Sequence, residues 1–288
     1  MCAVPALADE GTGHPLFLWR TQGASNSVYL LGSVHFADRA MYPLDPVIER
    51  AFARIPNLVV ELDLEREAAR VATLTMQEGF YRDGQSLKQH LPAELYLQVR
   101  DFAGGLGMPA ASVTQMKPWL LALSLSVLQA AAAGFEPEIG IDRYLLDRAA
   151  GKRITALEDA ELQIGLFSGL PHPMQVRFLK ETVNAAVDQQ AVGQLLDAWR
   201  DGDADALRAL LHASLDHPDG AELYQRVFVD RNRNMAAAIL ELLRESEDYF
   251  VVVGVGHFVG PLNILELLAG DGVAAERLVG AGRRPATR

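Results

Sequence analysis

The stretch from Asp248 to Gly260 (DYFVVVGVGHFVG) restricts the possible folds of this chain more than any other. Its run from Tyr249 to Val253 is apolar and rich in β-branched residues, which is typical of a strand buried in an α/β sheet. Two glycines end this run, His257 follows at once, and Pro261 to Leu268 is predicted to be a helix with proline in its first turn. His257 is therefore expected at the carboxyl edge of the sheet, where open α/β sheets bind ligands.

The same pattern occurs near the other end of the chain. Ser27 to Leu31 is a predicted strand, and Gly32, Ser33, Val34 and His35 follow it. Both strands therefore end in the motif Gly-x-x-His. One such motif arises often by chance, whereas two at matched strand ends indicate a shared function. The alternative is a pair of unrelated histidines that cap turns.

Strands and helices alternate in the order expected of an α/β fold. The strands are predicted near Phe17, Val28, Leu58, Arg153, Tyr249 and Ala274. The segment 28–63 reads as strand, helix (Pro46 to Arg54) and strand, which is typical of a parallel crossover. We expect one α/β domain over residues 16–280, with a mixed, mostly parallel central sheet. Two large helical insertions, 65–150 and 160–245, are expected to cover a cleft at the strand carboxyl ends.

Charge and cysteine content exclude several classes of function. The 288-residue chain has a formal net charge of -11 and no basic run, which disfavours nucleic acid and anionic lipid as partners. Cys2 is the single cysteine, so a zinc site built from cysteines is excluded. The apolar stretch from Trp119 to Phe135 is interrupted by polar residues, which favours a buried helix packed on the sheet over a transmembrane span.

The two ends of the chain are predicted to lie outside the fold. Residues 1–15 are expected to be a disordered terminus or the remnant of a signal peptide, because Ala6, Leu7 and Ala8 resemble the small-residue end of a secretory signal. This resemblance favours export to the periplasm or the extracellular space of a bacterium, with a cytoplasmic location as the alternative. Residues 281–288 are expected to be a loose tail.

Four ionisable residues lie at predicted strand ends: His35, Glu61, Glu158 and His257. Parallel neighbouring strands would bring them to one edge of the sheet. Two imidazoles and a carboxylate suit zinc, manganese, cobalt or iron, and a second carboxylate could activate a metal-bound water. Glu61 could instead act as a general base without metal. Either glutamate could also merely cap a helix N-terminus.

A polar sequence upstream of the last motif offers candidate substrate contacts. Arg231 and Asn232 lie on a predicted amphipathic helix, where they could hold a substrate carboxylate or a developing oxyanion, or simply face solvent. Ser33, inside the first Gly-x-x-His motif, is the third residue that we assign to substrate binding.

Several short motifs in this order resemble the TraB/GumN (TraB–PrgY–GumN) family. They are the two Gly-x-x-His motifs, Val60-Glu61-Leu62-Asp63, Lys117-Pro118-Trp119, Gly140-Ile141-Asp142, Leu157-Glu158 and Arg231-Asn232-x-x-Met235. The resemblance extends from about Phe17 to Val279. That family includes bacterial pheromone-shutdown proteins and the animal Tiki metalloproteases, and it is remotely similar to erythromycin esterases and a haem-binding lipoprotein group. Ser33 and Phe258 depart from the residues common in the family, threonine and leucine, without removing a ligand.

The resemblance implies a metal-dependent hydrolase with His35, His257 and Glu61 in the active centre. We expect hydrolysis of a peptide or a similar amide or ester with manganese, cobalt or zinc, and with Glu158 as a further catalytic or supporting residue. The alternatives are a non-catalytic protein that binds peptide, haem or metal, and a metal-free esterase-like hydrolase. The sequence specifies neither the substrate nor the oligomeric state.

Overall fold

A computed structural model of the chain describes residues 13–136, 139–184, 189–213 and 220–281. The expected signal remnant and tail therefore lie almost wholly outside the described residues. The strands are β1 (Pro15–Gln22), β2 (Ser27–Ser33), β3 (Asn57–Val60), β4 (Arg153–Ala156), β5 (Tyr249–Gly254) and β6 (Ala275–Val279). Each coincides with a strand predicted from the sequence.

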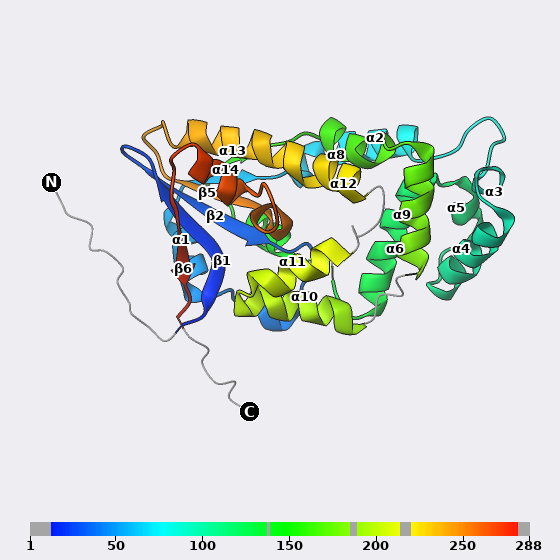
Figure 1. Cartoon of the computed structure of the whole chain (residues 1–288), viewed down its shortest axis with the longest axis horizontal. Helices are drawn as coiled ribbons and strands as arrows, with labels where there is room; N and C mark the ends of the chain where they lie inside the picture. The colour runs from blue at the N-terminus through cyan, green and yellow to red at the C-terminus, as the bar shows by residue number, and fades with distance from the viewer. Residues whose placement is uncertain (1–12, 137–138, 185–188, 214–219, 282–288) are drawn as a thin grey trace, which may run out of the picture.

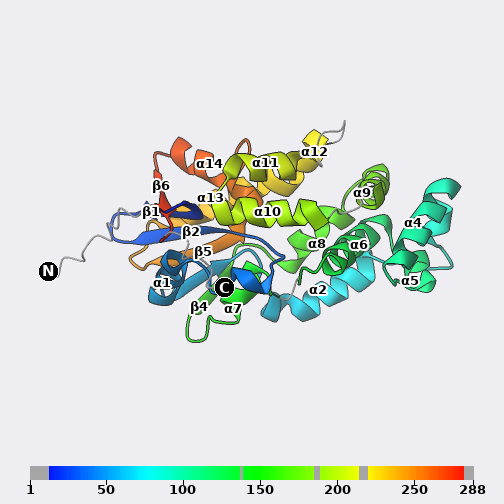
Figure 2. The same ribbon diagram turned by 90° about the horizontal axis from the view of Figure 1, so that it is seen from below.

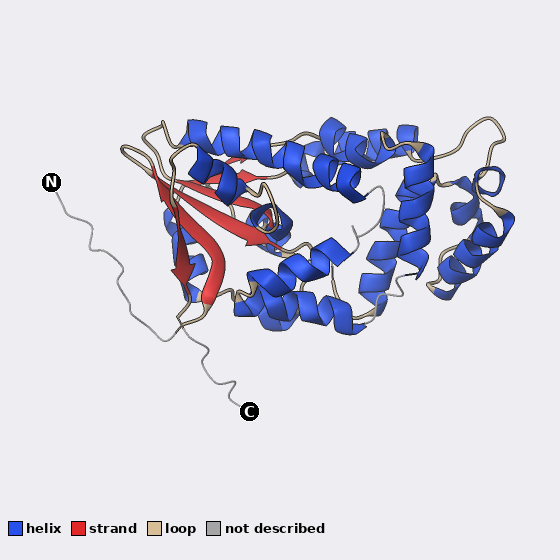
Figure 3. Ribbon diagram, in the orientation of Figure 1, coloured by secondary structure: helices blue, strands red, loops and turns tan. Residues whose placement is uncertain are grey.

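The six strands form one sheet in the order β4-β3-β5-β2-β1-β6. Figure 3 shows the strands in red, gathered at one end of the molecule. The strands β4, β3, β5 and β2 are parallel neighbours, and β1 is antiparallel to β2 and β6. The prediction of a mixed, mostly parallel sheet is confirmed. Because β5 is inserted between β2 and β3, the two Gly-x-x-His motifs follow adjacent strands although they lie far apart in the sequence.

Helices occupy the connections between strands. They are α1 (Pro46–Arg54), α2 (Leu64–Glu78), α3 (Leu87–His90), α4 (Ala93–Gly105), α5 (Ala110–Gln115), α6 (Pro118–Ala132), α7 (Ile141–Leu146), α8 (Ala160–Ser168), α9 (His172–Asn184), α10 (Gln189–Asp201), α11 (Ala204–Ala213), α12 (Gly220–Tyr224), α13 (Asp230–Leu242) and α14 (Ile264–Gly270). Figure 2 shows α10, α11 and α14 on one side of the sheet and α1 and α7 on the other. In Figure 1, α3, α4 and α5 lie at the end of the molecule farthest from the sheet.

The sheet is held by a continuous apolar core. Every residue of β3 is buried, and so is β5 up to Val253, which is the pattern of strands covered on both faces. From α1, Phe52 packs edge-to-face on Phe250 with ring centroids 5.6 Å apart. This core fixes the strands whose carboxyl ends carry the candidate site residues.

The apolar helix α6 is buried, but the predicted contact with the sheet is wrong. Its buried leucines belong to a second apolar cluster, formed with α4, α9 and neighbouring short helices. The sheet faces are already covered by other helices, so α6 packs against helices of both insertions instead. No helix among the described residues is long and apolar enough to cross a membrane.

Truncation of Leu125, a fully buried residue of α6, should lower the free energy of unfolding by about 2–5 kcal/mol, because Leu125→Ala removes apolar contacts and leaves a cavity. The exposed Val127 on the same helix provides the matched control, and Val127→Ala should change stability by less than about 0.5 kcal/mol. Urea unfolding followed by circular dichroism measures both values. Equal values for the two variants would contradict the assignment of a helical core.

The helix after the second motif begins later than predicted. A short 3-10 turn covers Val255–Phe258, and α14 starts at Ile264 rather than at Pro261. Leu262 has a positive φ of 55°, which breaks helical geometry, and the side chain of Asn263 caps α14 by accepting from the N–H of Glu266. The 3-10 turn places His257 directly at the end of β5.

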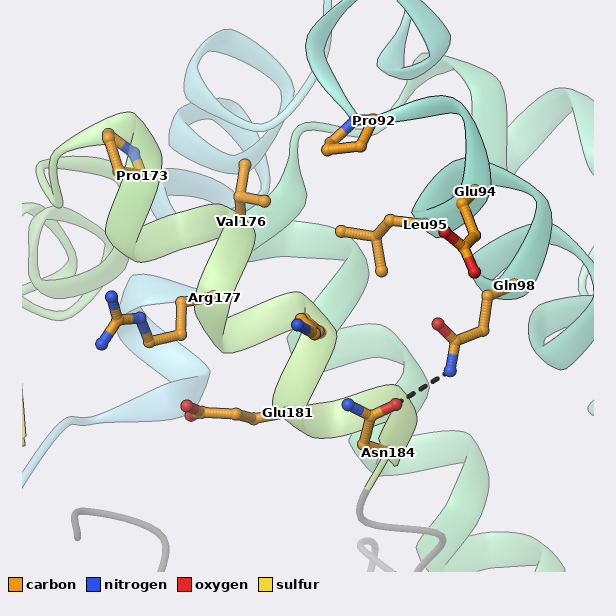
Figure 4. A pocket seen from close by; sticks show the side chains of 10 residues that line it. Pro92, Glu94, Leu95, Gln98, Pro173, Val176, Arg177, Glu181 and Asn184 are labelled. Carbon is orange, nitrogen blue, oxygen red and sulfur yellow. Dashed lines mark hydrogen bonds between the residues drawn. The ribbon is translucent and has the colours of Figure 1, made fainter. Parts of the chain in front are cut away.

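A groove of about 730 Å³ lies between α4 and α9 (Figure 4). Leu95 and Val176 form part of its lining, and the side chain of Gln98 donates a 2.8 Å hydrogen bond to that of Asn184. None of the candidate site residues lines this groove.

Candidate active site

The carboxyl ends of four parallel strands bring the predicted site residues to one edge of the sheet. His35 follows β2, Glu61 follows β3, Glu158 follows β4 and His257 follows β5. The backbone continues the pairing of β3 and β4 beyond the strands, because the N–H of Glu158 donates to the carbonyl of Glu61 at 2.9 Å. The sheet therefore fixes the two glutamates side by side.

Gly254, the last residue of β5, is the point around which three of these side chains gather. A β-carbon on Gly254 would lie 3.5 Å from Oε2 of Glu61, 3.8 Å from Nε2 of His35 and 3.8 Å from Cδ2 of His257. The structure therefore brings His35, Glu61 and His257 together, as their strand-end positions predicted. The missing side chain at Gly254 leaves space between them.

A hydrogen bond from Nδ1 to Asn232 holds the ring of His257 in one orientation. The amide of Asn232 donates through Nδ2 to the carbonyl of Leu262 at 2.9 Å, which leaves its Oδ1 to accept from Nδ1 of His257 at 2.6 Å. The proton thus sits on Nδ1, and the lone pair is on Nε2, which lies 4.0 Å from Oε1 of Glu61. Burial lowers the pKa of His257 to about 4, so the ring is neutral near pH 7.

His35 is held by a carboxylate instead of an amide. Its Nδ1 lies 3.0 Å from Oδ2 of Asp142, and the hydroxyl of Ser33 donates to Oδ1 of the same carboxylate at 2.6 Å. The Asp142 charge raises the pKa of His35 to about 9, although solvent screens part of this attraction because 66% of the side chain is exposed. A β-carbon on Gly140 would lie 2.4 Å from the carbonyl oxygen of His35, so only glycine lets α7 approach this closely.

Glu61 and Glu158 share one buried guanidinium. Arg231 donates from Nη2 to Oε1 of Glu61, and from Nε and Nη2 to the carboxylate of Glu158 at 2.7 and 2.8 Å. The amide of Gln163 also donates to both glutamates, and the N–H of Gly254 donates to Oε2 of Glu61 at 2.9 Å. Each buried carboxylate is therefore satisfied by several donors.

In these surroundings the pKa of Glu61 is lowered and that of Glu158 is raised. Desolvation opposes ionisation of Glu61, but the charges of His257, Arg231 and His35 and the hydrogen bond from Gly254 outweigh it and lower its pKa. Desolvation raises the pKa of Glu158 despite its hydrogen bonds from Arg231. Glu61 is therefore the carboxylate that stays ionised next to the histidines.

Neither glutamate caps a helix. The side chain of Asp63 caps α2 by accepting from the N–H of Arg66, and that of Asp159 caps α8 by accepting from the N–H of Leu162. In both loops the residue nearer the helix takes the capping position and leaves the glutamate at the strand end free to face the site.

The residues assigned to substrate binding are buried, and they contact the residues that hold or form the site. Ser33 and Asn232 are 1% and 0% exposed, and they contact Asp142 and His257, while Arg231 bridges the two glutamates. Sequence reasoning missed Asp142 and Gln163. For Asp142 the one available signal was its place in the Gly-Ile-Asp motif at the start of a predicted helix. No sequence signal pointed to Gln163.

The donor chemistry of the site fits a divalent transition metal. Nε2 of His35, the ring of His257 and the carboxylate of Glu61 border the space at Gly254, and each Nδ1 is hydrogen-bonded to an outer side chain, as is usual for metal-bound histidines. His35 would have to release a proton before its Nε2 could bind a metal, because the pKa of this ring is raised to about 9. Among the described residues, however, no group of three or more His, Cys, Asp or Glu side chains is already arranged as a metal site. The residues supply suitable ligands, not a preformed cage.

The buried neutral ring of His257 predicts a loss of stability in acid. An unfolded histidine takes up a proton near pH 6.5, whereas the folded ring does so only near pH 4, so the unfolded state binds more protons between these values. The stability contributed by His257 should therefore be complete above pH 6.5 and decline as pH falls toward 4. Urea unfolding at pH 7 and pH 4.5 measures the decline, which should be smaller in His257→Gln. Equal declines in both proteins would contradict this assignment.

Comparisons with known proteins agree with the motifs. The family model described as "TraB/PrgY/gumN family" matches residues 17–277. The "Uncharacterized protein YbaP" of Escherichia coli (strain K12) is 25% identical over 249 residues, 83% of this chain and 87% of that protein. An uncharacterized protein of Treponema pallidum (strain Nichols) is 20% identical over 263 residues, 87% of this chain and 79% of that protein.

A further relative has a name that states an activity. The "Metalloprotease TIKI homolog" of Amphimedon queenslandica is 24% identical over 318 residues, 91% of this chain and 61% of that protein. No solved structure matches this chain.

Proposed function

Because this chain belongs to the TraB/PrgY/gumN family, we propose that it is a metal-dependent hydrolase that cleaves a peptide or a similar amide or ester. The observation that carries the proposal is the gathering of His35, Glu61 and His257 around Gly254. The relative named as a metalloprotease supports the same reaction class. Manganese, cobalt and zinc are the metals that this set of nitrogen and oxygen donors suits.

In this proposal His35 and His257 are the residues that would hold the metal. A bound divalent metal would lower the pKa of a water and polarise the substrate carbonyl. Asn232 and Asp142 act as positioning residues, because each fixes the tautomer and the ring orientation of one histidine through Nδ1. The neutral His257 offers its lone pair without first losing a proton.

Glu61 is the proposed general base or a third ligand. Its carboxylate is ionised and lies beside both histidines, so it can accept a proton from water. Arg231 and Gln163 hold this carboxylate in place, and Glu158 accepts two further hydrogen bonds from Arg231. Arg231 could also contact an anionic substrate or transition state.

The N-terminal sequence supports a proposed location. We propose that the chain acts outside the bacterial cytoplasm, where a hydrolase would meet peptides, since its first residues resemble the end of a secretory signal.

Elemental analysis combined with a cleavage assay tests the function. The protein purified without chelators should contain about one equivalent of a transition metal, and it should cleave members of a peptide mixture when manganese, cobalt or zinc is supplied. Chelation should abolish cleavage, and the metal should restore it. Tight binding of metal and peptide without cleavage would favour a binding protein, and cleavage that survives chelation would favour a metal-free esterase-like enzyme.

A further inference from the structure

A π-helical turn interrupts the helix that carries Arg231. It covers Gln225–Val229, between α12 and α13, and the N–H of Asp230 donates to the carbonyl of Gln225, five residues earlier. Such turns are rare and are frequently found at functional sites. The carbonyl of Val227, inside the turn, accepts a 3.0 Å hydrogen bond from Nη1 of Arg231. The turn thus helps to fix the guanidinium that holds Glu61.

The same turn places the ring of Phe228 against the second Gly-x-x-His motif. The Phe228 and His257 rings meet edge-to-face with centroids 5.5 Å apart. A β-carbon on Gly256 would lie 2.6 Å from Cε1 of Phe228, so the ring occupies the space that any other residue at 256 would need. Leu211 of α11 approaches the same point to 3.6 Å. Phe228 and Leu211 therefore form an apolar surface beside His257.

Phe228 lies near the residues of the same helical segment that contact the site. Arg231 and Asn232 follow it by three and four positions, the spacing at which helical side chains are neighbours, and they contact Glu61 and His257. Phe228 is only half-buried, so part of this residue is accessible to solvent. None of the hydrogen bonds and ion pairs described for Glu61, Glu158 and the two histidines involves Phe228.

We propose that Phe228 is a specificity-determining residue, whose ring selects substrates with an apolar side chain next to the bond that is cleaved. This inference rests on the proposed hydrolase function. Contact between the ring and an apolar side chain removes both from water, whereas a polar side chain at the same place would lose hydrogen bonds to water without replacement. The site would therefore discriminate against peptides that are polar next to the cleaved bond.

The test compares matched peptides. The cleavage sites of the wild type in a mixed peptide digest are read by mass spectrometry, and one cleaved peptide is then synthesised with either leucine or serine at the preferred position. We expect kcat/KM to be at least about 10-fold higher for the leucine peptide. Phe228→Ala should lower this ratio by about 10-fold and Phe228→Leu by less, while bound metal stays at the wild-type level. The matched control Phe167→Ala removes a half-buried ring that stacks on Phe178, and it should keep the wild-type ratio.

Three outcomes would overturn the inference. In the first, Phe228→Ala keeps the wild-type ratio. In the second, Phe228→Ala loses turnover and bound metal equally for both peptides, which would make the ring a packing residue for His257 alone. In the third, the wild type cleaves no peptide with any of the metals; the proposed function then fails, and the inference fails with it. The first two require an active wild type, so they are distinguished from the third.

Discussion

Replacement of Glu61 by glutamine should slow peptide cleavage by about 10²–10⁴-fold, the usual worth of a positioned general base. Glutamine keeps the size of the side chain and can still accept from the N–H of Gly254, but it cannot take a proton from water. Substrate affinity should change little, because the base acts mainly in the transition state. The measurement is kcat and KM on any peptide that the wild type cleaves, with bound metal determined on the same samples.

The fold should tolerate this substitution. Arg231 loses one charged partner but keeps its hydrogen bonds to Glu158, so its guanidinium is not left as an unpaired buried charge. Bound metal separates the two roles proposed for Glu61, because loss of metal in Glu61→Gln would mark a ligand and retention of metal would mark a base.

Asp63, two positions beyond Glu61 in the same loop, provides the matched control. Its side chain caps α2, so Asp63→Ala should cost about 1 kcal/mol of stability and leave turnover unchanged. The opposite pattern, with wild-type turnover in Glu61→Gln and inactivity in Asp63→Ala, would remove Glu61 from the chemistry.

The sequence predicted the strand ends because their determinants are local. Five apolar residues before Gly254 specify a buried strand wherever the rest of the chain lies, and the parallel pairing of β2 and β5 then brings His35 and His257 to the same edge. Convergence of the two histidines followed from strand direction together with the expectation that the strands are parallel neighbours. No contact between distant side chains had to be known.

Contacts between elements that are distant in the chain could not be predicted from the sequence. Asp142 contacts His35 across 107 positions and Gln163 contacts Glu61 across 102, and both pairs depend on how helices pack against the sheet edge. The same limit explains the error for α6, whose apolar residues indicate burial without indicating the partner. The sequence also left the capping residue of α2 open, since Glu61 and Asp63 are both acidic and only backbone geometry decides which one caps the helix.

Removal of His257 should abolish metal binding and cleavage together. His257→Ala deletes a proposed ligand, so the affinity for metal should fall by more than the roughly 10–100-fold expected when an outer partner of a ligand is removed. Asn232→Ala is that milder change, because it leaves the imidazole but removes the acceptor of its Nδ1 proton. The two variants should therefore form a graded series in metal affinity and in turnover. His90→Ala, which removes a ring stacked on Tyr81 instead, should match the wild type in both.

Thermal melting monitored with and without added metal separates loss of a ligand from loss of the fold. His257→Ala leaves a buried cavity beside Asn232, so a lower melting temperature without metal is expected and is not by itself evidence of a role. The informative quantity is the increase in melting temperature on adding manganese, cobalt or zinc, because a metal that binds only the folded state stabilises it. That increase should be present in the wild type and in His90→Ala, reduced in Asn232→Ala and absent in His257→Ala. A wild-type increase in His257→Ala would show that the metal lies elsewhere, and the metal-dependent mechanism at Gly254 would have to be abandoned.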